Sequence, residues 1–135
     1  MNYYKETGDP RLAEALDAVL GTSEAFLEVA ERIGDVEIQL AALNNLASAK
    51  YDAGYYQDSI ADCEDALEIA NRDPAWRYWI GVLHHTLGMS FDCMGDNVRA
   101  KHALCTAFEI YSELGDSNKI RLLREYAAER EHVLE

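Results

Sequence analysis

The sequence is poor in residues that interrupt helices: it has only two prolines among 135 residues, and no run alternates strand-forming apolar and polar residues. Between the breaks, apolar residues recur every three or four positions, which places them on one face of an α-helix. No apolar run approaches the roughly 18 residues that a membrane-spanning helix needs. The N-terminal stretch also lacks the basic start and apolar core of a secretory signal. The pattern therefore predicts an all-α protein that is not a membrane protein.

Cysteine is also scarce. The three cysteines, Cys63, Cys93 and Cys105, are widely spaced and include no Cys-x-x-Cys pair. An odd number with this spacing argues against a disulfide framework and against a zinc finger. We expect all three to be small buried side chains of a protein in a reducing, cytoplasmic setting.

The first half of the chain has few basic residues. The net charge is −13, and residues 1–71 carry 15 acidic against 4 basic side chains. Such a surface repels DNA and RNA, so we expect no nucleic-acid partner. A neutral or basic partner surface complements it, although the acidity also serves solubility alone.

The few breaks share one chemistry, an aspartate that can cap the next helix. Both prolines follow an aspartate, and other breaks read Gly-Asp, where glycine can end one helix and aspartate can begin another. We expect Gly21 to interrupt or kink the first helix. The predicted helices are 10–33, 36–53, 56–71, 74–94, 97–113 and 117–133. Their short connections favour antiparallel hairpins.

The chain also repeats internally with an offset of 41 residues. The first copy reads Leu43, Leu46-Ala47, Lys50, Gly54, Tyr56, Ser59, Cys63 and Ala66. The second copy reads His84, Leu87-Gly88, Phe91, Gly95, Asn97, Ala100, Leu104 and Ala107. This order of large, small and aromatic positions resembles the tetratricopeptide repeat, in an elongated variant. Lys50 and Asn97 depart from it where an aromatic is usual, and His84 departs at a usually apolar position.

The resemblance implies one domain over residues 1–135, an α-α superhelix of stacked hairpins. Residues 10–33 would be a flanking helix, 36–71 and 74–114 the two repeats, and 117–133 a capping helix. The first helix of each pair would line a concave groove. Seven residues would then form the binding surface: Asn44, Ser48, Tyr51, Tyr78, His85, Met89 and Asp92.

We therefore expect a non-catalytic scaffold or sensor module that binds a protein or peptide, neutral or basic, without a cofactor. A regulatory role in the cytoplasm fits the resemblance, although a fold alone does not establish a function. An alternative is a self-assembly module that forms a homodimer. Another class of alternative is a small metal-binding or catalytic helical bundle.

The metal and enzyme alternatives have little support in the sequence. His84 and His85 are consecutive, so they point about 100° apart on a helix and cannot share an ion from one face. The stripe of His85, Met89 and Asp92 or Cys93 could hold copper(I) only with ligands from another helix. Glu129-x-x-His132 lacks the second such motif of a di-iron site. The sequence contains no GxSxG, phosphate loop or HExxH, so we expect no catalytic residues.

Overall fold

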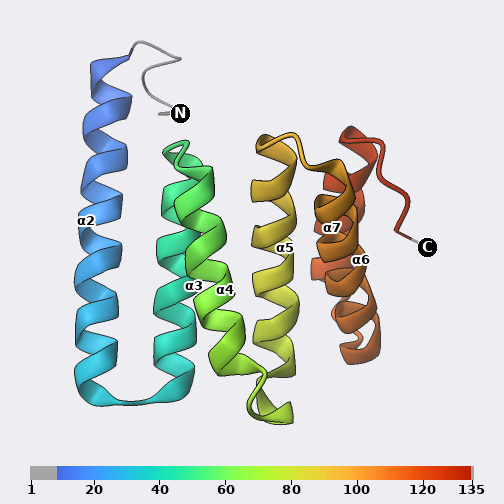
Figure 1. Cartoon of the computed structure of the whole chain (residues 1–135), viewed down its shortest axis with the longest axis horizontal. Coiled ribbons are helices and arrows are strands. Elements are labelled where there is room, and N and C mark those ends of the chain that lie inside the picture. The colour runs from blue at the N-terminus through green and yellow to red at the C-terminus, as the bar shows by residue number, and fades with distance from the viewer. Residues whose placement is uncertain (1–8, 135) are drawn as a thin grey trace.

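The computed structural model describes residues 9–134 and shows a row of antiparallel helices packed against their neighbours (Figure 1). It confirms the predicted all-α fold of helical hairpins. No helix in this range is both long and apolar enough to span a membrane. The α-helices are α2 (Pro10–Ile33), α3 (Val36–Asp52), α4 (Tyr56–Ala70), α5 (Arg77–Cys93), α6 (Asn97–Leu114) and α7 (Ser117–Glu129).

Aspartate begins most of these helices, as predicted. The side chain of Asp35 accepts a hydrogen bond from the amide of Ile38 at 3.0 Å, and Asp9, Asp96 and Asp116 cap α2, α6 and α7 in the same manner. Each bond satisfies an amide that has no partner within the helix. Gly34 and Gly115 end α2 and α6 in the left-handed conformation, with φ of 77° and 68°.

Three helix predictions need correction. Residues 74–76 form a 3-10 turn, η1 (Pro74–Trp76), so the α-helix expected from residue 74 begins at Arg77. Gly21 does not interrupt α2, which runs unbroken through it. The last helix was expected to reach residue 133, but α7 ends at Glu129, because the chain turns there and Glu131 takes a left-handed φ of 59°.

Buried side chains form two connected core clusters. One lies between the hairpins α3–α4 and α5–α6 and includes Leu40, Leu83 and Ile110, all fully buried. The second lies under α7 and includes Leu104 and Leu123. Trp79 packs against both clusters. The core therefore holds the first helices of the pairs, α3, α5 and α7, at fixed positions.

The two hairpins pack alike at equivalent positions, with compensating sizes. A Cβ at Gly88 would lie 2.7 Å from Leu104 and 3.2 Å from the carbonyl oxygen of Ala100. At the positions 41 residues earlier stand Ala47 and Cys63, both fully buried. Ala47 is larger than its equivalent Gly88, whereas Cys63 is smaller than its equivalent Leu104. This compensation indicates that the two residues of each pair contact each other in both hairpins.

A second pair of positions shows the same exchange. A Cβ at Gly81 would lie 2.9 Å from Ile110 and 3.1 Å from the ring of Tyr111, which is fully buried. The equivalent residues of the first hairpin are Leu40 and Ala70, also fully buried. The glycine therefore makes room for the tyrosine ring, whose hydroxyl lies 3.4 Å from Nδ1 of His85 on α5.

Lys50, the departure from an aromatic position, forms an ion pair with Asp62 of α4. Its Nζ lies 2.7 Å from Oδ2, and the side chains are 23% and 15% exposed. Within residues 9–134 that oxygen has no hydrogen bond besides this charge contact. In the second hairpin the equivalent residues are Phe91 and Ala103. A half-buried ion pair thus replaces an aromatic ring packed near a small residue.

This replacement gives a testable prediction. Lys50→Met should lower the free energy of unfolding by about 1–3 kcal/mol, since it leaves a buried carboxylate without its cation. The double variant Lys50→Phe/Asp62→Ala, which copies the second hairpin, should recover most or all of that loss. Urea unfolding followed by circular dichroism measures both. A double variant less stable than Lys50→Met would contradict the equivalence of the two hairpins.

Candidate functional site

The helices α3, α5 and α7 run in the same direction (Figure 1), and side chains of α5 contact both α3 and α7. Thr86 of α5 donates a hydrogen bond to Oδ1 of Asn44 on α3 at 3.2 Å. Tyr126 of α7 donates one to Oδ2 of Asp92 on α5 at 2.7 Å. These polar contacts join the three helices into one continuous surface.

A hollow of about 470 Å³ lies at the C-terminal ends of these helices. Tyr51 and Tyr56 lie in its wall with ring centres 5.7 Å apart, and the exposed thiol of Cys93 lines it as well. Burial raises the pKa of Tyr51 and of Asp52. The hollow therefore offers aromatic, acidic and cationic groups together; its lining is Leu16, Tyr51, Asp52, Tyr56, Cys93 and Arg130.

The structure brings only part of the predicted groove to this hollow. Tyr51 lines it, whereas Asn44, Ser48 and Met89 are half-buried along α3 and α5. Tyr78 is 38% exposed and its ring meets Trp79 edge-on at 5.4 Å. It sits at the start of α5, about 20 Å of helix from the hollow at a rise of 1.5 Å per residue. Tyr78 therefore does not belong to the hollow.

Asp92, the predicted groove carboxylate, is engaged by the end of the chain. Nε2 of His132 lies 2.8 Å from Oδ1 and 3.1 Å from Oδ2, and Tyr126 donates to Oδ2. The side chains of His132 and Asp92 are 8% and 6% exposed. Because a carboxylate only accepts, Nε2 carries the proton of this bond. Asp92 thus anchors the turn after α7, and we name Asp92, Tyr126 and His132 the C-terminal latch.

His85 is enclosed by aromatic rings. The ring of Tyr111 lies 6.1 Å from that of His85 and the ring of Tyr126 lies 6.4 Å away, both near edge-on. The hydroxyl of Tyr111 is 3.4 Å from Nδ1 of His85. Burial, with a smaller contribution from Lys119, lowers the pKa of His85 to about 4. The imidazole is therefore neutral near pH 7 and acts as a packing group between α5, α6 and α7.

This shift predicts that acid weakens the fold through His85. An unfolded histidine binds a proton near pH 6.5 and the folded one near pH 4, so stability is full above about 6.5 and falls as the pH drops toward 4. The loss should reach about 3 kcal/mol. His85→Phe keeps a ring and removes the titration, so its unfolding free energy should fall less over this interval. Equal pH dependence of the two proteins, measured by urea unfolding, would contradict the assignment.

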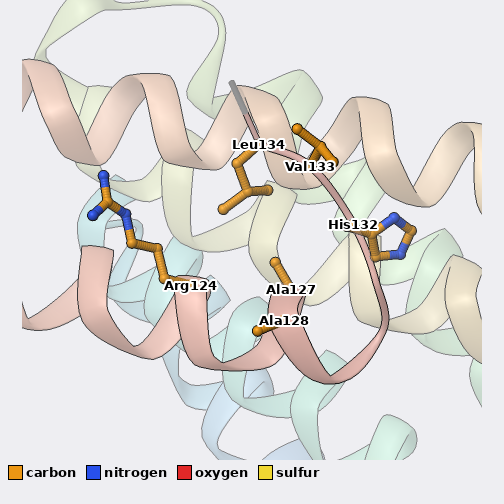
Figure 2. Close-up of a pocket in the computed structure, with 6 residues that line it drawn as sticks. All are labelled: Arg124, Ala127, Ala128, His132, Val133 and Leu134. Atoms are coloured by element: carbon orange, nitrogen blue, oxygen red, sulfur yellow. The ribbon is translucent and has the colours of Figure 1, made fainter.

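The residues after α7 fold back along α6 and α7. The amide of His132 donates to the carbonyl of Ala127 at 2.9 Å, and the thiol of Cys105 lies 3.7 Å from the carbonyl oxygen of Val133. Leu134 joins the core cluster under α7. Figure 2 shows Leu134 pointing toward α7 over a hollow of about 220 Å³, while the ring of His132 points away from it. The tail therefore covers the end of the helix row.

Further hollows lie on the opposite side, between α4 and α6. They measure about 440 and 550 Å³ and share Glu64, Phe91 and Arg99. The guanidinium of Arg99 lies 5.8 Å from the centre of the Phe91 ring. These hollows leave Met94 and Val98 exposed beside them. This surface was not predicted from the sequence, which pointed to a groove along the first helix of each pair instead.

The prediction that all three cysteines are buried is wrong for two of them. Cys63 is fully buried, and burial raises the pKa of its thiol to about 12. Cys93 is exposed and Cys105 is half-buried, and all three are free thiols. Among the described residues, no three or more His, Cys, Asp or Glu side chains are grouped to hold a metal ion. The exposed thiol is useful, because it places a chemical probe inside the hollow.

Asp52 and Cys93 lie on the predicted groove helices but were not predicted, and three other residues of the hollow come from elsewhere in the chain. Leu16 lies on α2, Tyr56 begins α4 and Arg130 follows α7. Tyr126, on α7, was not among the predicted groove residues either. Thr86 of α5 contacts Asn44 on α3. In the same way Tyr126 of α7 contacts His85 and Asp92 on α5.

Comparison of the chain with protein-family models, with curated proteins and with solved structures gives no significant match.

Proposed function

We propose that the chain is a non-catalytic binding module that holds a protein or peptide segment against α3, α5 and α7. The observation that carries the proposal is the hollow at the C-terminal ends of these helices. Concave sites with a few placed polar groups among apolar ones are the usual form of binding pockets. The internal 41-residue similarity, which resembles the tetratricopeptide repeat, supports the same role.

The chemistry of the hollow favours a neutral or basic segment. Tyr51 and Tyr56 line the hollow with aromatic rings, which can contact an apolar or a cationic side chain. Asp52 is an exposed residue at the rim, whereas Asp92 is already occupied by His132. The net charge of −13 steers basic partners toward the chain. Asp52 therefore takes the place of Asp92 as the acidic determinant of the site.

A cytoplasmic location and a scaffold or sensor role belong to this proposal. The three free thiols, one of them exposed, suit a reducing compartment. A module that binds through a rigid row of helices needs no cofactor, and its output is the presence or absence of a bound partner.

A selection from a random-peptide display library tests the proposal. Selected peptides should be neutral or basic, and Tyr51→Ala should weaken their binding about tenfold or more, the effect of removing one aromatic anchor. Asp52→Asn should weaken basic peptides about two- to fivefold. Glu68→Gln, on the outward face of α4, is the matched control and should leave affinity unchanged. Peptides whose affinity is the same in all four proteins would refute a site at this hollow.

A further inference from the structure

Helix α2 carries apolar residues on two adjacent sides. Ser23 and Ala30 are buried on the side that packs against α3, with Leu16, Leu20 and Leu27 half-buried beside them. A second stripe lies beside this side of the helix and advances by alternating steps of three and four residues. All its members are exposed except Leu12 and Phe26, which are half-buried. The stripe is Leu12, Ala15, Val19, Thr22, Phe26, Val29 and Ile33.

The exposure of this stripe is high for large apolar residues. Val19 is 51% exposed, Val29 49% and Ile33 61%, and together they follow one side of the helix. The stripe extends about 32 Å at the helical rise of 1.5 Å per residue. Contiguous apolar surface of this kind on a helix marks an interface rather than scattered exposure.

The outer side of α7, at the opposite end of the row of helices, has no comparable apolar stripe. The outer side of α7 is mostly charged, with Arg121 paired to Glu125 at 3.1 Å, and Leu134 of the tail packs over the groove between α6 and α7. Stacked helical arrays need polar or covered ends to stay apart from one another. Only the α7 end meets this requirement within the described residues.

We propose that a second copy of this chain covers the stripe, with the two α2 helices antiparallel across a two-fold axis. Apolar residues that alternate in spacing between three and four positions are typical of the contact line between two paired helices. In this arrangement small residues meet large ones: Ala15 faces Ile33 of the second copy, and Thr22 faces Phe26. Val19 meets Val29. The two-fold axis repeats each contact, as a self-complementary interface requires.

The charges beside the stripe fit the same arrangement. Glu14 and Arg32 are 18 residues apart, which is five full helical turns, so they lie on the same side of α2. Arg32 is exposed and pairs with Glu28 of its own helix at 2.6 Å, and antiparallel pairing also brings it near Glu14 of the other copy, twice. A parallel pair would set like charges side by side. The acidic residues Asp17, Glu24 and Glu31 are exposed on other sides of the helix, so they do not oppose the contact.

Sedimentation equilibrium of the full chain, from low micromolar to several hundred micromolar, tests the proposal. The chain should form a dimer in this range, and Val29→Lys or Ile33→Lys should weaken it about tenfold or more. Val98→Lys on α6 is the matched control, because Val98 is also apolar and 82% exposed. Circular dichroism should show the same helix content in every variant, since the changed side chains are exposed.

Exchanging the charges of Glu14 and Arg32 tests whether the partner at the stripe is a second copy of this chain. Glu14→Arg or Arg32→Glu alone should weaken the dimer about two- to fivefold, and the double exchange should restore it. A strictly monomeric chain would overturn the proposal, as would an equal effect of Val98→Lys and Val29→Lys, or no recovery in the double exchange. The test is independent of peptide binding, because the hollow and the stripe are measured in separate experiments.

Discussion

Gly88→Ala should lower the free energy of unfolding by about 1–3 kcal/mol, because its new methyl group would overlap Leu104 and press on the carbonyl of Ala100. Leu104→Cys alone should cost about 2–4 kcal/mol through the space that it leaves. The double variant reproduces the pair Ala47 and Cys63 of the first hairpin. It should be more stable than the sum of the single effects by about 1–2 kcal/mol.

Gly21→Ala is the control for this cycle. Nothing lies within 4 Å of a Cβ at Gly21, so alanine should raise stability by about 0.5–1 kcal/mol through its helix propensity. Urea unfolding of the five proteins gives all the values. If the Gly88 and Leu104 changes simply add, the two hairpins do not share one packing scheme and the internal repeat loses its structural meaning.

His132→Ala and Asp92→Ala should each release the tail after α7 and cost about 1–3 kcal/mol, since each deletes a buried, charge-assisted hydrogen bond. The double variant should cost little more than the larger single change, because both remove the same contact. Release can be followed at Cys105, whose thiol lies beside the carbonyl of Val133. Its alkylation should become faster by about tenfold when the tail opens.

Arg77→Ala is the control for the C-terminal latch. Arg77 and Glu113 form an ion pair at 3.1 Å whose side chains are 44% and 50% exposed, so its loss should cost no more than about 1 kcal/mol. It should leave the alkylation of Cys105 unchanged. An unaltered Cys105 rate in His132→Ala would show that the tail stays in place without the latch.

The helices and their ends followed from local chemistry that the sequence carries. Asp35, Asp96 and Asp116 cap the helices that follow them, and Gly34 and Gly115 end the helices before them. Such features depend on a few consecutive residues, which is why they could be predicted. The apolar repeat positions Leu87 and Leu104 are likewise buried in the core.

The site depended on contacts between distant residues, and there the sequence was a weaker guide. The helical pattern of the sequence continues through residue 133, but α7 ends at Glu129. Beyond that end, His132 forms a hydrogen bond with Asp92, 40 residues earlier, which the pattern of a single helix does not reveal. Cys93 has apolar and helical neighbours, yet it lies at the end of α5, where the hollow exposes it. His85 was predicted as groove wall, and the enclosing rings of Tyr111 and Tyr126 could not be read from its own helix.

The rate of Cys93 alkylation is the most direct test of the proposed binding site. The measurement uses the variant Cys105→Ser with a maleimide, since Cys63 is buried and Cys93 is then the exposed thiol. A saturating peptide from the display selection should slow the reaction about tenfold or more, because it fills the hollow that Cys93 lines. A peptide that binds tightly and leaves the rate unchanged would contradict a binding site at the ends of α3, α5 and α7.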